Sequence, residues 1–173
     1  GDSAWVRLPS GRTLLLDAGG GTHQTFDVGR NVVARYLWLR KRWRVDILAI
    51  SHPHPDHADG AKFVLERIRV GELWTSPEFP GPDGYGAELL EIARRRGVPH
   101  RVLRAGDVAW QGPEESIRAL APPSTLYDDV NDNSLVLRID ADGATALFPG
   151  DVGARSETRM FLSGEDLRAG LLK

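Results

Sequence analysis

The chain has 173 residues, 41% of them hydrophobic, which suits one globular domain with a single core. Its formal charge of −2 gives no overall attraction toward nucleic acid, and the absence of cysteine excludes disulfides, thiolate zinc sites and cysteine nucleophiles. The sequence has neither a long apolar run nor a signal-peptide pattern. Because it begins Gly-Asp-Ser without a methionine, we expect it to be part of a longer protein, which would supply any membrane anchor.

The first elements predicted are the two strands of a hairpin. Residues 4–8 alternate as in an outer strand, and residues 13–16 follow them after the turn Pro9-Ser10-Gly11. Asp17 ends the second strand, where we expect it to face the same rim as the histidines described below. Neither nucleotide-phosphate glycine pattern fits the three glycines that follow, so we expect no small-molecule nucleotide cofactor. His23, in the same loop, is more typical of a surface residue than of a ligand.

A helix is predicted over residues 28–42, with apolar side chains at helical spacing and basic side chains on its other face. The apolar positions are Val32, Tyr36, Leu39 and Trp43, and the basic positions are Arg35, Arg40, Lys41, Arg42 and Arg44. A charge run of this kind is usually a solvated face, and a DNA-binding surface is the alternative.

Three of the five histidines fall within residues 52–57, as His-x-His-x-Asp-His. Residues 47–50 form an apolar run that leads into this motif and predict a buried central strand. The prolines at positions 53 and 55 favour extended geometry at His52 and His54, so we expect these two imidazoles to point the same way.

Asp56 and His57 complete the motif where the chain turns into a helix, which the apolar spacing predicts from about Asp59 onward. We expect these two side chains to face a second point close to the first. Imidazole and carboxylate are ligands for zinc, manganese or iron, and two such centres side by side suit hydrolytic chemistry. A loop of solvated histidines is the alternative.

The rest of the chain predicts a second set of strands. After a strand over 73–75, a loop over 77–86 and a helix over 87–96, the predicted strands cover 101–103, 107–110, 116–120, 134–139 and 145–148. The last two are joined by a hairpin turn over 140–143. Asp151 follows the last strand, where a bridging metal ligand and a turn or cap residue are equally typical. Closing helices are predicted over 156–162 and 166–172, and His100 is predicted to be structural.

With Asp17, the histidine motif and Asp151 each at the end of a predicted strand, the chain resembles the metallo-β-lactamase fold, a four-layer αββα sandwich. More narrowly, it resembles the C-terminal domain of ComEC-type DNA-internalisation competence proteins. The segments that carry this resemblance are residues 1–3, 15–21, 26–33, 131–137 and 150–151, which spread over nearly the whole chain.

The resemblance implies a domain of a membrane protein at the extracytoplasmic face of the bacterial cytoplasmic membrane, beside the channel part of the same parent chain. It implies a metal-dependent nuclease that degrades the non-transported strand of incoming DNA and meets single-stranded or double-stranded DNA. Two divalent metal ions are expected. By position, His52 and His54 would hold the first ion, Asp56 and His57 the second, and Asp151 would bridge them; Asp56 and Asp151 are also the predicted catalytic residues.

Other positions follow from the same resemblance. Asp17 would orient the site, and Asn131 or Asn133 falls where many relatives place a further histidine. Because asparagine is a weaker and neutral donor, manganese is favoured over zinc. The family continues past the point matching Lys173 into a segment whose histidine completes the second site, so we expect one ion or none in this chain, and impaired activity.

Two alternative functions stay open. The same fold could act on a lactone, a thioester or a cyclic nucleotide, because the motif reports metal chemistry and not substrate. A metal-free domain could instead guide DNA toward a channel through the basic residues between positions 35 and 44.

Overall fold

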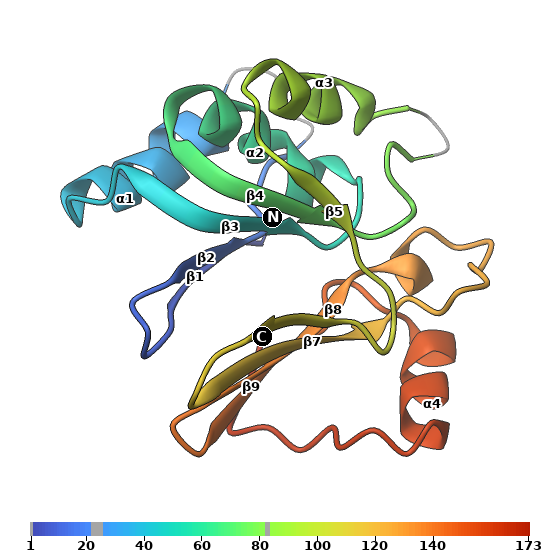
Figure 1. Ribbon diagram of the computed structural model, residues 1–173. Coiled ribbons are helices and arrows are strands. Elements are labelled where there is room, and N and C mark those ends of the chain that lie inside the picture. The colour runs from blue at the N-terminus through green and yellow to red at the C-terminus, as the bar shows by residue number, and fades with distance from the viewer. Residues whose placement is uncertain (1, 22–25, 82–83) are drawn as a thin grey trace.

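The structure is a computed structural model that describes residues 2–21, 26–81 and 84–173, so His23 lies outside the described residues. Two five-stranded sheets pack face to face, with helices on their outer faces (Figure 1). The predicted αββα sandwich is therefore confirmed.

The first sheet has the order β1-β2-β3-β4-β5. Its strands are β1 (Ala4–Arg7), β2 (Thr13–Leu16), β3 (Arg44–Ile50), β4 (Arg69–Thr75) and β5 (His100–Val102). β1 pairs antiparallel with β2 at the edge, and the other pairs are parallel. The predicted alternation of β1 is observed, since Val6 packs between the sheets whereas Trp5 packs toward the helices.

The second sheet has the order β10-β9-β8-β7-β6. Its strands are β6 (Val108–Gln111), β7 (Glu115–Ala121), β8 (Val136–Ala141), β9 (Ala144–Phe148) and β10 (Leu171–Leu172). β8 and β9 form the predicted hairpin, and both central turn residues, Asp142 and Gly143, have positive φ as a tight two-residue turn requires.

The helix predicted over residues 166–172 is wrong. The chain there lacks helical hydrogen bonding, and Leu171–Leu172 form β10, which pairs parallel with β9. The backbone N–H of Gly170 donates to the Thr145 carbonyl at 2.9 Å, and that of Lys173 donates to the Leu147 carbonyl at 3.2 Å. The free edge of β9 thus provides hydrogen-bond partners for the backbone of this segment. A short helix would have to form its hydrogen bonds internally, which is unfavourable for so few residues.

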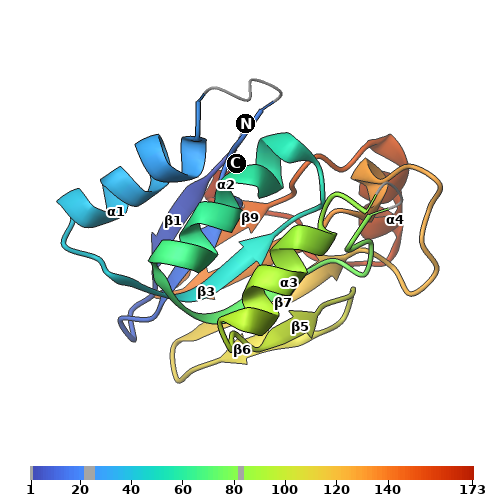
Figure 2. The ribbon, with the colours of Figure 1, turned by 90° about the horizontal axis from the view of Figure 1, so that it is seen from above.

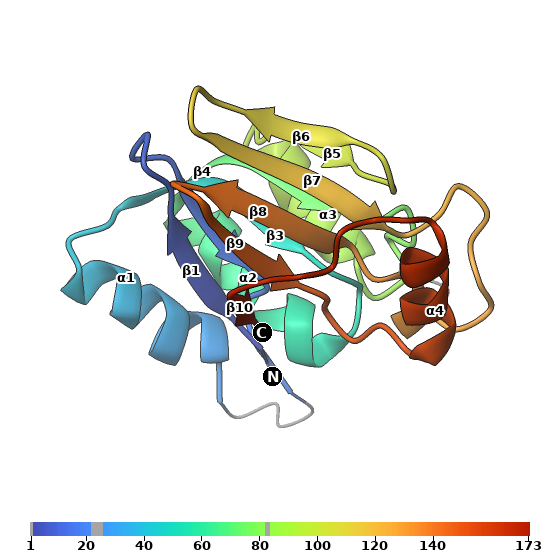
Figure 3. The same cartoon turned by 90° about the horizontal axis from the view of Figure 1, so that it is seen from below.

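Helices cover the outer face of the first sheet (Figure 2). They are the π-helical turn η1 (Gly29–Ala34), α1 (Arg35–Leu39), α2 (Pro55–Arg67) and α3 (Ala87–Arg95). The second sheet carries α4 (Ala154–Leu162), and the 3-10 turn η2 (Asn131–Asn133) lies before β8 (Figure 3). The predicted helices over 87–96 and 156–162 are confirmed.

Apolar side chains form three packed layers. One joins the helices to the first sheet and contains Leu37 and Leu48, and one lies between the sheets and contains Ile47 and Ile117. The third lies under α4, around Met160. The predicted central strand, residues 47–50, is buried along its whole length and contributes to the first two layers.

The apolar stripe predicted along residues 28–42 does not face the sheet. Leu39 is 84% exposed and Trp43 is 62% exposed. The buried side of η1 and α1 is instead formed by Gly29, Val33, Ala34 and Leu37. A β-carbon on Gly29 would lie 2.2 Å from the Gly60 carbonyl oxygen, so the backbones of η1 and α2 touch there and fix which face turns inward.

Candidate metal centre

The histidine motif lies at the rim where β2 and β3 end. Because the two strands are parallel, Asp17 after β2 and Ser51 after β3 emerge side by side. His54 has the extended geometry predicted for it, with φ −77° and ψ 147°, and it is the N-cap of α2. This helix begins at Pro55, four residues before the predicted start, because proline is pre-organised for the first helical position. Asp56 and His57 therefore lie in its first turn.

The three rings of the motif lie together. The centroids of His52 and His57 are 4.3 Å apart, and those of His52 and His54 are 4.7 Å apart. One ligand atom each from His52, His57 and Asp151 lies within 4.8 Å of the other two. The structure thus brings Asp151 to the histidines across almost one hundred residues of sequence. The division into a His52–His54 ion and an Asp56–His57 ion stays a prediction.

His57 is surrounded by carboxylates. Its Nδ1 lies 2.9 Å from Asp17 Oδ2, and its Nε2 lies 3.2 Å from Asp151 Oδ1 and 3.6 Å from Asp56 Oδ2. Burial lowers the pKa of His57, but the hydrogen bond to Asp17 and the three negative charges outweigh it, so this pKa is raised. The surroundings of this ring therefore favour a positive charge.

His52 is fully buried and has a different environment. Its Nδ1 lies 3.0 Å from Ser51 Oγ and 3.3 Å from Ser134 Oγ, whereas its Nε2 has no hydrogen-bond partner among the described residues. Burial, and then the nearby His57, lower the pKa of His52 to about 4, so the ring is neutral at pH 7. A neutral imidazole held at one nitrogen with the other unpartnered is typical of a metal ligand.

Asp17 fixes this rim from beneath. Its carboxylate accepts hydrogen bonds from the backbone N–H of Ser51 at 2.7 Å and from Ser51 Oγ at 3.0 Å, in addition to its contact with His57. The glycines after it pack against α2, since a β-carbon on Gly20 would lie 2.0 Å from the Pro55 carbonyl oxygen. They therefore bring the Asp17 loop close to the motif.

Asp151 reaches the cluster because the residues that follow β9 approach the residues that follow β3 closely. Gly150 has φ +62°, and a β-carbon there would lie 2.9 Å from Ser51 Cβ. Asp132 Oδ1 then accepts hydrogen bonds from the backbone of Gly153 and Ser156 and holds the start of α4. The side chains of Asp151 and Asp56 are 39% and 50% exposed, so the carboxylates line the solvent side of the buried histidines.

The two predicted asparagines have different surroundings. Asn133 is buried and fully engaged, with Oδ1 accepting from the Tyr127 backbone N–H and Nδ2 donating to Glu78 and to the Tyr127 carbonyl. Its side chain thus joins two loops. Asn131 has a buried Oδ1 without a hydrogen-bond partner in the described part of the chain, which leaves this oxygen available to a ligand.

Ser51 and Ser134 are the site residues that the sequence did not identify. Ser51 stands next to the motif, so its position was a usable signal, but Ser134 carries no pattern that separates it from other strand-flanking serines. His100 has the structural role predicted for it, because its Nε2 lies 2.8 Å from Thr75 Oγ1 between neighbouring strands.

The basic residues predicted to bind DNA lie away from this rim. Arg44 begins β3 and Arg40, Lys41 and Arg42 precede it, whereas the histidine motif follows the other end of the strand. Seven residues of strand span about 20 Å, so these side chains cannot touch a phosphate held at the histidines. A role for them and for Arg35 in DNA binding stays a prediction.

Comparison with known proteins gives a family match over almost the whole chain. A model of the metallo-beta-lactamase superfamily matches residues 1–171. The chain is 26% identical over 184 residues to ComE operon protein 3 of Bacillus subtilis (strain 168), which confirms the predicted resemblance to ComEC-type proteins. All of this chain is covered, but it spans only 24% of that relative.

Solved structures share the fold. Zn(2+)-bound PqqB from Methylobacterium extorquens has a TM-score of 0.59 at 15% identity, covering 91% of this chain and 56% of that one. CmlA, a diiron beta-hydroxylase from Streptomyces venezuelae, has a TM-score of 0.56 at 16% identity, covering 98% of this chain and 32% of that one. Among the described residues, every helix is too short or too polar to cross a membrane.

Proposed function

This chain belongs to the metallo-beta-lactamase superfamily, and from that premise we propose that it is a metal-dependent phosphodiesterase that cleaves DNA. The observation that carries the proposal is the cluster of His52, His57 and Asp151, in which a buried imidazole nitrogen has no hydrogen-bond partner among the residues that the structure describes. Buried polar atoms without partners are rare in proteins, and here the atom lies among donors of the types that divalent metals bind.

The residues fit a metal ion. His52 and His57 would each present Nε2, Asp151 and Asp56 would present carboxylate oxygens from the solvent side, and His54 would contribute from the N-cap of α2. When bound, divalent ions lower the pKa of water and neutralise charge on phosphodiester oxygens. Two ions are proposed for the complete site. Manganese is favoured over zinc because the Asn131 oxygen, a weaker and neutral donor, would serve where many relatives place a histidine.

The surrounding side chains prepare these ligands. Asp17 accepts the hydrogen bond at His57 Nδ1, which directs Nε2 of that ring toward Asp151. Ser51 and Ser134 hold Nδ1 of His52 in the same way. Asp56 and Asp151 are the exposed carboxylates, so we assign to them the exchange of protons with water and with the leaving group.

A nucleic-acid substrate is supported by two features. The similarity to ComE operon protein 3, which covers all of this chain and 24% of that relative, supports a role in DNA uptake. We infer that the chain acts as part of a membrane protein, at the extracytoplasmic face and next to the channel of the parent chain. In addition, the 13-residue helix α2 begins at the rim, where its partial positive charge favours a phosphate.

The test is digestion of labelled single-stranded and double-stranded DNA with added Mn²⁺, in this chain and in a version extended past Lys173. In the extended version we expect cleavage by the wild type and a loss of about 100-fold or more in His52→Ala, His54→Ala and Asp56→Ala, whereas this chain should cleave more slowly. His100→Ala is the matched control, since this histidine bonds to Thr75 outside the cluster, and it should retain full activity. Equal rates in all variants would exclude this function.

The same preparation separates the alternatives. A small-substrate hydrolase would hydrolyse a lactone, thioester or cyclic nucleotide with a KM that salt barely changes, whereas DNA binding weakens steeply with salt. A DNA-guiding domain would contain no metal by elemental analysis and would bind DNA without cutting it.

A further inference from the structure

The outer side of η1 and α1, with the turn that follows, carries an apolar stripe that the fold leaves in solvent. Val32, Tyr36, Leu39 and Trp43 are 51%, 42%, 84% and 62% exposed. Together with the basic residues Arg35, Arg40, Lys41 and Arg42, we call them the α1 surface. We propose that the α1 surface docks the domain onto an anionic lipid bilayer.

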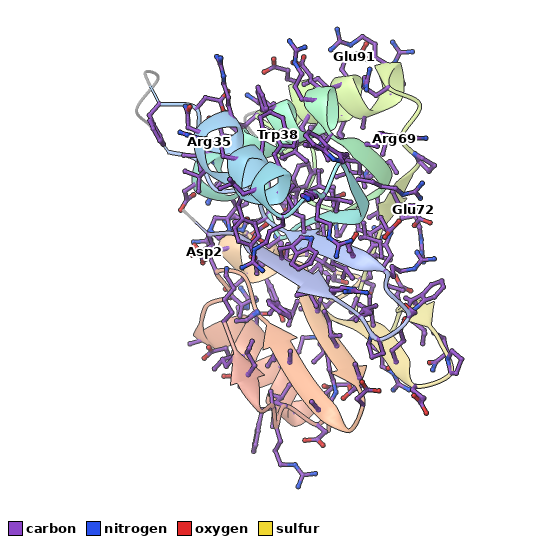
Figure 4. The ribbon with its side chains drawn as sticks, turned by 90° about the vertical axis from the view of Figure 1, so that its left-hand side faces the viewer. Asp2, Arg35, Trp38, Arg69, Glu72 and Glu91 are labelled. Atoms are coloured by element: carbon purple, nitrogen blue, oxygen red, sulfur yellow. The ribbon has the colours of Figure 1, made fainter. Side chains whose placement is uncertain are left out.

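The apolar part lies at an edge of the molecule. Val32, Tyr36 and Leu39 are spaced by four and three residues and so follow one side of η1 and α1, and Trp43 comes after the turn at Arg40 and Lys41. In Figures 1 and 2, α1 lies at one edge of the molecule with its C-terminal end, at Leu39, outermost. Figure 4 views this side and labels Arg35 and Trp38 on the helix. An exposed apolar patch with a polar rim is typical of an interaction site.

The charge around the stripe is positive and is not neutralised by neighbouring carboxylates. Within the described residues, Arg35, Arg40, Lys41 and Arg42 form no ion pair, whereas Arg44 pairs with Asp46 at 2.9 Å. The whole chain carries −2, so this positive surface is local. It complements anionic headgroups, which attract basic side chains close to the membrane surface.

The side chains suit lipid better than they suit single-stranded nucleic acid. Bases stack on aromatic faces, but the Arg40 guanidinium lies 5.2 Å from the Tyr36 ring centre, and Trp43 lies against Trp38 at 6.2 Å with a 30° tilt. The most exposed member is Leu39, which offers no surface for stacking. A leucine flanked by tyrosine, tryptophan and arginine is the composition of a helix that lies in a membrane interface.

The position of the α1 surface leaves the metal centre accessible. It precedes β3, and the histidine motif follows the far end of the same strand, about 20 Å away. Docking would therefore hold the domain at the membrane without covering the rim. The inference does not depend on catalysis, because it uses none of the residues assigned to the metal centre.

The experiment is flotation of the full chain with vesicles of phosphatidylglycerol and, separately, of phosphatidylcholine. We expect binding to phosphatidylglycerol that weakens with salt. Leu39→Ser combined with Trp43→Ser should lower the binding about tenfold or more at every salt concentration. Arg40→Gln combined with Arg42→Gln should lower it about tenfold at low salt and less at high salt.

Matched controls distinguish docking through the α1 surface from non-specific binding to vesicles. Phe161 and Leu162 on α4 are 75% and 76% exposed, so Phe161→Ser combined with Leu162→Ser removes similar apolar area from another face. Arg94→Gln combined with Arg95→Gln removes two exposed charges from α3. Both control variants should float with the vesicles as the wild type does, and all variants should have the melting temperature of the wild type.

Three results would overturn the proposal. The first is absence of binding to phosphatidylglycerol vesicles, and the second is an equal loss in the α4 control. The third is a different occupant. Oligonucleotide binding that needs Arg40 and Arg42 but not Leu39 would assign the surface to nucleic acid, and a dimer in sedimentation that Leu39→Ser dissociates would assign it to a second copy of the chain.

Discussion

The two ends of β3 carry opposite chemistry. At its C-terminal end, polar side chains are buried and held by one another, as Asp17 holds Ser51 and His57. At its N-terminal end, apolar side chains such as Leu39 and Trp43 are exposed near Arg40 and Arg42, which have no acidic partner in the described part of the chain.

This difference shows where the fold restricts the sequence. Buried polar groups are tolerated only where hydrogen bonds or ligands replace water, so each member of the rim depends on the others. An exposed apolar group needs no such partner and contributes little to folding. Substitutions at the rim should therefore change metal binding or stability strongly, and substitutions on the α1 surface should change neither.

The largest effect is expected from Asp17→Asn. Asparagine tolerates the φ of +54° at this position, but it removes the charge that orients His57. We expect metal affinity to fall about 10- to 100-fold, as measured by calorimetric titration with Mn²⁺ and Zn²⁺. Asp46→Asn, which alters a carboxylate at the opposite end of β3, is the control and should titrate like the wild type. Unchanged affinity in Asp17→Asn would remove Asp17 from the site.

Gly60→Ala tests the close packing of α2 against the loop after Asp17 and against η1. In an exposed helix, alanine is more favourable than glycine by about 1 kcal/mol. Here, however, the β-carbon of alanine would lie 2.1 Å from the Ala18 carbonyl oxygen. We expect the clash to dominate and to lower the free energy of unfolding by about 1–3 kcal/mol in a denaturant titration. In Gly21→Ala the new β-carbon meets no described atom within 4 Å, so this variant should be neutral or stabilising. If Gly60→Ala and Gly21→Ala have the same free energy of unfolding, the close packing at Gly60 does not contribute to stability.

A smaller effect is expected from Asp46→Asn as pH changes. Burial raises the pKa of this carboxyl, but hydrogen bonds from Thr13 and Arg44 outweigh burial and hold the pKa below 3.8. The stabilisation is therefore present above about pH 4 and is lost as pH falls through the lowered folded pKa. We expect Asp46→Asn to lower the free energy of unfolding by about 1 kcal/mol at pH 7, and to leave it unchanged at a pH below the lowered pKa of Asp46. A stability difference that stays constant with pH would contradict this.

The smallest effect on folding is expected from Leu39→Ser. Because Leu39 is 84% exposed, its removal should change the free energy of unfolding by no more than about 0.5 kcal/mol. Leu37→Ser, on the buried side of the same helix, should cost several times more. A similar loss in both variants, measured by thermal unfolding, would mean that Leu39 packs against the protein after all.

The sequence alone was sufficient to predict those structural features that depend on interactions between residues close together in the chain. Alternation in residues 4–8 correctly predicted an outer strand with two distinct faces, and the apolar run 47–50 correctly predicted the buried central strand. Two prolines gave the extended geometry at His54. These patterns depend on backbone preferences within a few residues, which are encoded where they act.

Only the tertiary structure decided which distant groups meet. The approach of Asp151 to His57 and of Ser134 to His52 depends on how β9 and β8 pack against β3, and no local pattern specifies that contact. The outward face of α1 depends on Gly29 touching Gly60, and β10 depends on the free edge of β9. A local sequence pattern can predict a helix with an apolar face or a strand with a free edge. Which face is buried and which edge is paired depends on residues elsewhere in the chain, and is therefore determined only when the layers pack together.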